Sequence, residues 1–152
     1  MRSPEERLAE MGLAVPEVVP PLAAYVPAVR TGSLVFTAGQ LPARDGVMLA
    51  TGKLGAGVSE EEGYACARQC ALNALAAIKA EIGELSAIKR VVKAVVFVAS
   101  TPEFTAHPKV ANGASEFLGE VFGDIGKHAR SAVGVAALPL DVPVEVELIV
   151  EI

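Results

Sequence analysis

The 152-residue sequence predicts an α+β fold, in which a mixed β-sheet carries two helices on one of its faces. Strand-like segments precede, separate and follow two segments with helical periodicity. The segment between the two helices is mostly β-branched, and the length is that of one domain spanning residues 1–152. Hydrophobic residues make up 52% and charged residues 20% of the chain, which excludes intrinsic disorder.

Residues 1–23 are expected to form an N-terminal extension. Prolines at positions 4, 16, 20 and 21 favour a short helix followed by an extended arm. A β-hairpin is predicted from Tyr25 to Gln40, with Thr31-Gly32 as the turn between its strands. Residues 47–49 lie between two glycine-containing turn signals and form either a small strand or an ordered loop.

The clearest helix begins after Ser59. Ser59 and Glu62 have the spacing of a capping box, in which each side chain accepts a hydrogen bond from the other residue's amide. The helix is expected to run to about Ile82, with Gly83 as a left-handed C-cap. Apolar residues cover much of its circumference, which predicts that the helix lies against a sheet.

The second half of the chain predicts a long strand, a second helix and two final strands. Residues 89–100 form the long strand, and their near-continuous apolar run implies burial on both faces. The second helix spans Pro108 to Phe122, where apolar residues recur at helical spacing. The final strands are expected at residues 132–137 and 142–152. Two helices cover only one face of such a sheet, so a second copy of the chain is the expected cover for the other.

Net charge and hydropathy argue against nucleic-acid and membrane partners. The formal net charge is −5 and the basic residues are scattered, which argues against nucleic acid as a partner. No apolar run approaches the roughly 18 residues that span a bilayer, and the N-terminus lacks the apolar core of a signal peptide. We therefore expect a cytoplasmic protein without membrane association.

Metal and cofactor sites are not expected either. Cys66 and Cys70 would share one helix face and could hold a metal only with two further ligands. His107 and His128 fall in no recognisable zinc spacing, so we interpret the cysteines as core residues. No dinucleotide- or phosphate-binding glycine motif is present in the sequence.

Two features of the C-terminal third could carry chemistry. Arg130 precedes an uncharged apolar strand, where its guanidinium suits two-pronged binding of a small carboxylate; a plain surface charge is the alternative. Glu145 and Glu147 alternate with apolar residues and therefore share one strand face. That face is either solvated or presents a carboxylate that activates water in a cleft.

These residues are part of a longer pattern. It includes the run Phe36-Thr37-Ala38-Gly39-Gln40-Leu41-Pro42 and the block Ala129-Arg130-Ser131-x-Val133 … Leu138-Pro139-x-Asp141-Val142-x-Val144-Glu145-Val146-Glu147. Further matches are Ala67-Arg68-Gln69, Asn73, Val95, Phe97-Val98 and Phe104. Over about residues 24–151 the pattern resembles the YjgF-like reactive intermediate deaminase (Rid) family, also labelled endoribonuclease L-PSP.

The resemblance implies a chorismate mutase-like fold and a homotrimer whose sheets face inward as a barrel, with a ligand cleft at each subunit interface. The activity it implies is hydrolysis of 2-imino or 2-enamino acids to 2-oxo acids and ammonia, without a cofactor. Arg130 falls on the family arginine that binds the substrate carboxylate, and Glu145 falls on the glutamate that holds the attacking water. Tyr25 falls on the family tyrosine near the end of the first strand, and Gly39 falls on the glycine whose backbone borders the cleft. Asn112 is the candidate for the family's helix asparagine, and all three are expected to bind substrate.

Several departures from the family pattern indicate a divergent subgroup. Pro27 stands where the family usually has glutamine, Ala132 replaces a cysteine and Gly134 replaces a glutamate, and the segment 104–117 is longer. The first function predicted is hydrolysis of an imino or enamino acid, or of a related small carboxylate. The alternative is a non-catalytic trimer that binds a small carboxylate, while a ribonuclease is disfavoured by the acidic charge.

Overall fold

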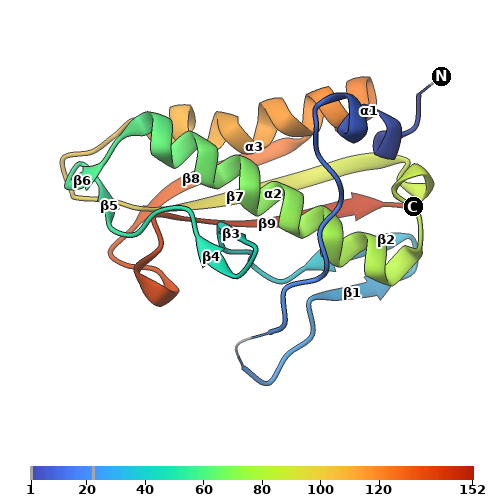
Figure 1. Ribbon diagram of the computed structural model, residues 1–152, viewed down its shortest axis with the longest axis horizontal. Coiled ribbons are helices and arrows are strands. Elements are labelled where there is room, and N and C mark those ends of the chain that lie inside the picture. The colour runs from blue at the N-terminus through green and yellow to red at the C-terminus, as the bar shows by residue number, and fades with distance from the viewer. Residues whose placement is uncertain (1, 22) are drawn as a thin grey trace.

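The structure is a computed structural model and describes residues 2–21 and 23–152. Its main sheet has five strands in the order β1-β2-β9-β7-β8, and only the β7–β8 pair is parallel (Figure 1). The mixed sheet of an α+β fold is therefore confirmed. The five strands are β1 (Ala28–Thr31), β2 (Leu34–Thr37), β7 (Arg90–Ala99), β8 (Ala129–Val135) and β9 (Val144–Glu151).

The N-terminal hairpin is confirmed, with a small shift in its turn. Thr31 pairs with Leu34, so the turn residues are Gly32 and Ser33, one position later than predicted. Gly32 has a φ of 59°, a left-handed conformation that glycine adopts without steric cost. The segment at 47–49 contains a small strand. This strand is β4 (Val47–Met48), which pairs with β3 (Ala43–Arg44), and a second two-stranded pair follows, β5 (Lys53–Leu54) with β6 (Gly57–Val58).

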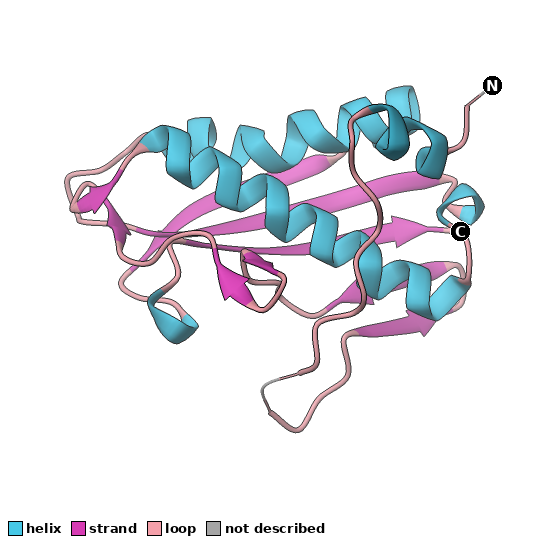
Figure 2. Cartoon of the chain, viewed as in Figure 1, coloured by secondary structure: helices cyan, strands magenta, loops and turns pink. Residues whose placement is uncertain are grey.

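Both long helices lie side by side on one face of the sheet (Figure 2), as predicted. They are α2 (Glu60–Ile82) and α3 (His107–Phe122). The capping box forms: the Glu62 amide donates to Ser59 Oγ at 3.1 Å, and the Ser59 amide donates to Glu62 Oε1 at 3.2 Å. Gly83 follows α2 with a φ of 91°, so both predicted ends of this helix are confirmed.

Within the single chain, β7 is buried on one face, and its other face is the one for which a second copy of the chain is the expected cover. Ala94, Val96 and Val98 are fully buried against the helical layer. Val95 and Phe97 alternate with them and are half-buried on the opposite face. The reason is that none of the described helices lies on that second face of the sheet (Figure 1).

β8 begins three residues earlier than predicted, at Ala129. Ala129 and Arg130 pair in parallel with Lys93 and Ala94 of β7, and this pairing extends the strand toward the N-terminus. Arg130 is therefore a residue of the edge strand itself rather than of the loop before it. The periodicity of the apolar residues did not reveal this, because strand pairing does not depend on apolar side chains.

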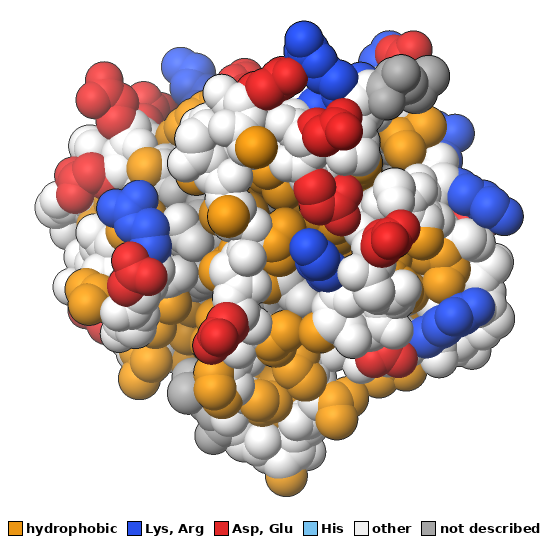
Figure 3. Space-filling view, turned by 45° about the vertical axis from the view of Figure 1, so that its right-hand side comes forward, with side chains coloured by type: hydrophobic (Ala, Val, Ile, Leu, Met, Phe, Trp, Pro, Cys, Tyr) orange, Lys and Arg blue, Asp and Glu red, His pale blue; other side chains and the backbone are white. Residues whose placement is uncertain are grey.

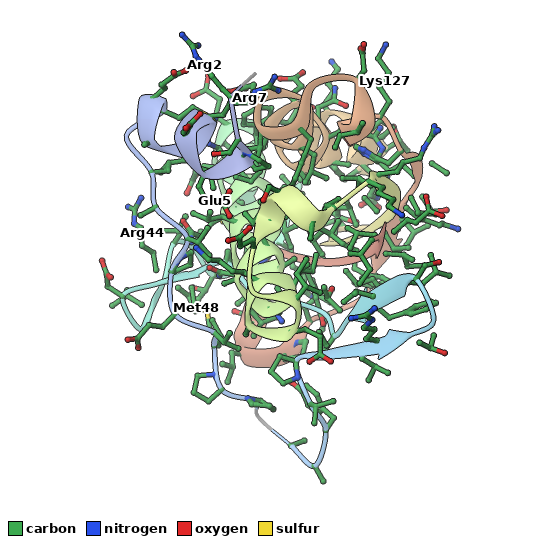
Figure 4. The ribbon with its side chains drawn as sticks, turned by 90° about the vertical axis from the view of Figure 1, so that its right-hand side faces the viewer. Arg2, Glu5, Arg7, Arg44, Met48 and Lys127 are labelled. Atoms are coloured by element: carbon green, nitrogen blue, oxygen red, sulfur yellow. The ribbon has the colours of Figure 1, made fainter. Side chains whose placement is uncertain are left out.

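The N-terminal extension packs against the helical layer. Its helix α1 (Pro4–Glu10) buries Leu8, and Glu5 Oε1 accepts a hydrogen bond from the Leu85 amide at 2.8 Å. Arg7 lies between α1 and the end of α3 in Figure 4 and donates to the Val121 carbonyl at 3.5 Å. The predicted short helix is confirmed, and the described residues of the predicted extended arm, 13–21, form no regular secondary structure.

Hydrophobic side chains gather at the lower end of the molecule in Figure 3, where the chain leads into β1 (Figure 1). Acidic and basic side chains are concentrated on the upper part of the same view. Within residues 2–21 and 23–152, no helix is long and apolar enough to cross a membrane.

Candidate active site

One small cavity brings together three of the predicted site residues. Tyr25, Gly39 and Glu145 line a space of about 80 Å³, which Met48 and prolines of the N-terminal arm also border. A water molecule needs roughly 10–15 Å³ of such space, so the cavity has room for a ligand of only a few heavy atoms. The N-terminal arm thus forms part of the wall of this candidate site.

Glu145 is a half-buried carboxylate on β9, opposite the buried residues Val144 and Val146. It lies directly against Gly39, and a methyl group at position 39 would overlap its Oε2 atom and lie 2.8 Å from Cδ. Burial raises the pKa of the Glu145 carboxyl, and the nearby charge of Glu147 raises it further. A carboxylate with a raised pKa in a small cavity is suited to take a proton from water.

Arg130 is held by two neutral side chains of α3. Its Nη1 donates to Asn112 Oδ1 at 2.8 Å and to Ser115 Oγ at 3.1 Å. Arg130 therefore has two hydrogen-bond partners within its own chain, because α3 lies alongside the edge strand. Among residues 2–21 and 23–152, Arg130 makes no ion pair. Asn112, the predicted helix asparagine, therefore lies in contact with Arg130, but neither residue lines the cavity beside Glu145.

Arg130 and Glu145 do not meet within one chain. Arg130 pairs with the buried Ala94 and leaves the sheet on the helical side, whereas Glu145 pairs with Phe97 and leaves it on the open side. Two strand spacings and three residues along the strands separate their Cα atoms, which gives about 14 Å. A ligand of a few heavy atoms cannot contact both side chains of one chain.

The glycine at position 134 has a structural explanation. A methyl group at Gly134 would lie 2.5 Å from His107 Nε2 and 2.9 Å from Ser100 Oγ. The His107 ring occupies the space that a side chain at position 134 would need. The ring also packs edge-on against the Phe104 ring, with 5.3 Å between the two ring centroids. The packing of His107, the first residue of α3, therefore explains why position 134 of β8 is a glycine.

Sequence reasoning missed two hydrogen-bonded serine–histidine pairs that involve residues of α3. Ser115 and His128 hydrogen-bond to each other at 2.8 Å beside Arg130, and His107 hydrogen-bonds to Ser100 at 3.1 Å. The spacings of these pairs along the chain match no known motif, and only the packing of α3 beside β8 brings Ser115 next to His128 and Arg130. A signal existed in part, since Arg130 and His128 lie in the same polar segment.

The two cysteines are core residues, as predicted. Cys66 and Cys70 are free thiols with 1% and 0% exposure. Burial raises the pKa of the Cys66 thiol to about 11, and burial also raises that of Cys70. Neutral thiols in the core are neither nucleophiles nor ready metal ligands. Within the part of the chain that the structure describes, no group of three or more His, Cys, Asp or Glu side chains could hold a metal ion.

The fold and this site define the class of protein. Residues 5–152 match the model of the family described as "YjgF/chorismate_mutase-like, putative endoribonuclease". The chain belongs to this family, which confirms the resemblance found in the sequence.

Individual relatives agree with this assignment. Protein TCP17 of Trypanosoma cruzi is 45% identical over 146 residues, which cover 95% of this chain and 91% of that protein. The crystal structure of Atu1372, a protein of unknown function from Agrobacterium tumefaciens, has a TM-score of 0.92 and 44% identity, covering 98% of this chain and 92% of that one. A "putative endoribonuclease" from Shewanella oneidensis has a TM-score of 0.96 and 38% identity, with 99% and 100% coverage.

Proposed function

We propose that this protein hydrolyses a small 2-imino or 2-enamino acid to a 2-oxo acid and ammonia, at a site shared between neighbouring copies of a homotrimer. The observation that carries the proposal is the Glu145 carboxylate on the wall of the cavity, with its pKa raised by burial. Such a carboxylate is suited to accept a proton from a water molecule that attacks the C=N carbon.

Arg130 supplies the second requirement, recognition of the substrate carboxylate. Among the described residues, both side-chain hydrogen bonds of Arg130 are made by Nη1, and together they fix the orientation of the guanidinium. The N–H groups on Nε and Nη2 are then the donors for a carboxylate, in the two-pronged geometry that lysine cannot reproduce. Asn112 acts by positioning Arg130 rather than by contacting the reacting atoms.

The separation of the two groups supports a composite site. Because Glu145 and Arg130 leave opposite faces of the sheet about 14 Å apart, one ligand reaches both only if they come from different copies. The open face also supports association between copies of the chain, because three apolar residues on it are exposed to solvent. The exposed fractions are 52% for Val29, 39% for Phe36 and 42% for Val133. A heterologous contact that repeats three times closes into a ring with three equivalent sites.

Mixed trimers of two inactive variants test this proposal. Arg130→Ala and Glu145→Gln are each expected to abolish ammonia release from enzymatically generated 2-imino acids. If every site takes Glu145 from one copy and Arg130 from the next, any trimer containing both variants has one intact site. Refolding the variants together at equal amounts should then restore about one quarter of the wild-type activity.

The outcome separates the competing readings. No recovery in mixed trimers that are shown to form would rule out the shared site. A non-catalytic binding protein is the second candidate, favoured by the departure at Gly134 and its filling by His107. It predicts that 2-oxo acids raise the melting temperature of the wild type while no imino acid releases ammonia. An endoribonuclease activity is not proposed, since the net charge of −5 disfavours binding of a phosphate backbone.

A further inference from the structure

Beside α3 and the edge strand β8 lies a serine–histidine pair, Ser115 and His128, which takes no part in the chemical step of the proposed deamination. His128 Nδ1 lies 2.6 Å from the Gly126 carbonyl oxygen, which only accepts hydrogen bonds. Nδ1 therefore carries the proton of the neutral ring, and Nε2 presents a lone pair. Ser115 Oγ lies 2.8 Å from Nε2 and is the donor of that hydrogen bond.

This arrangement is that of an activated nucleophile. A base within hydrogen-bond reach of a hydroxyl, held in one tautomer by a third group, is the geometry by which serine is made reactive. Arg130 adds a positive charge, because its Nη1 donates to Ser115 Oγ at 3.1 Å and stabilises negative charge that develops on this oxygen. Asn112 holds the same Nη1 at 2.8 Å.

The pair opens to solvent. Ser115, His128 and Arg130 line a depression of about 320 Å³, which Gly119 and Gly126 also border. Lys127 lines it as well and extends outward at the top of Figure 4, with its ammonium 3.5 Å from an Asp124 carboxylate. A ligand entering this depression meets a nucleophile, a base and two cations together.

We propose that Ser115 is a histidine-activated nucleophile that hydrolyses esters of small acids carrying a second, anionic group. Ser115 Oγ attacks the ester carbonyl carbon while its proton passes to His128 Nε2. The carbon–oxygen bond to the alcohol then breaks, and the alcohol leaves with that proton. Water hydrolyses the acyl-serine, releases the acid and restores Ser115. Arg130 and Lys127 bind the anionic group. This activity needs no imine, but it shares Arg130 with the proposed deamination, so it is tested by covalent labelling of Ser115 and not by ammonia release.

The chain contains a matched control in its other serine–histidine pair. Ser100 Oγ is 3.1 Å from His107 Nε2, but it also lies 3.3 Å from the Val98 carbonyl oxygen, to which its hydroxyl donates. His107 is then the donor to Ser100 and does not act as its base. The two pairs thus differ in which residue donates the hydrogen bond between serine and histidine: Ser115 donates to His128, whereas His107 donates to Ser100.

Covalent labelling of the full-length protein tests the assignment. A fluorophosphonate probe should add one phosphonyl group to Ser115 and none to Ser100, as read by peptide mass mapping. His128→Asn keeps a donor for Gly126 but removes the base, and should slow labelling about 10²-fold or more. Ser100→Ala should label at the wild-type rate. A monoanionic succinate p-nitrophenyl ester should acylate Ser115 at least about tenfold faster than the neutral propionate ester.

Three results would overturn the proposal. They are an unlabelled Ser115 in the folded wild type, equal labelling of Ser115 and Ser100, or an unchanged labelling rate in His128→Asn. Circular dichroism of each variant ensures that a lost adduct does not come from a lost fold, and the wild-type mass map remains decisive if a variant does not fold.

Discussion

Replacing Gly39 by alanine tests whether the position of the Glu145 carboxylate governs turnover. A methyl group at Gly39 would overlap Glu145 Oε2 and would lie 2.8 Å from Cδ and 3.0 Å from Cγ. The backbone at Gly39 is outside the left-handed region, so alanine fits the local conformation. The carboxylate, at the end of a flexible and half-buried side chain, must therefore turn away from the cavity wall.

The expected effect is large on activity and small on folding. Only the flexible end of one side chain has to move, so we expect a loss of less than about 1 kcal/mol in the free energy of unfolding. A displacement of about 1 Å in a reacting group can cost on the order of 10²-fold in rate. Gly39→Ala should accordingly lower kcat for ammonia release by about 100-fold.

The assay compares four proteins: the wild type, Gly39→Ala, Glu145→Ala and the double variant. Ammonia release from 2-imino acids gives kcat, and urea unfolding gives stability. If Gly39→Ala acts by displacing Glu145, it should have no further effect on the residual rate in the Glu145→Ala background. Wild-type turnover in Gly39→Ala, or an equal loss in both backgrounds, would refute the reasoning.

Two further predictions concern stability. Gly113→Ala should lower the free energy of unfolding by about 1–3 kcal/mol, because the new methyl group meets backbone atoms of Tyr64 at 2.9 and 3.1 Å, where α2 and α3 touch. Gly119→Ala on the same helix meets nothing within 4 Å and should raise it by about 0.5–1 kcal/mol; similar shifts in urea would contradict this packing argument. Glu145→Gln should stabilise the protein at neutral pH, by less than about 1 kcal/mol because the carboxyl is half exposed. Its pKa is raised in the folded state, so the ionised form is disfavoured there, and the gain should grow as pH rises through that pKa and vanish in acid, where both states are protonated. Melting curves that show the same gain at every pH would contradict this sign.

Local patterns predicted most of the fold. The capping box at Ser59, the glycine after α2 and the alternation around Glu145 involve residues that are neighbours along the chain. Their geometry depends on hydrogen bonds and side-chain periods within one element, which the order of residues determines directly. The same local logic identified Glu145 as facing away from the core, although not what it faces.

Only the tertiary structure determined which functional side chains lie close together. The position of Arg130 in the edge strand depends on the register of β8 on β7. Its hydrogen bonds to Asn112 and Ser115 depend on how α3 packs beside β8. The Ser115–His128 pair depends on the same docking, because its members belong to different elements. Residues in separate elements come together only through packing of the whole helical layer on the sheet, and no spacing along the chain encodes that contact.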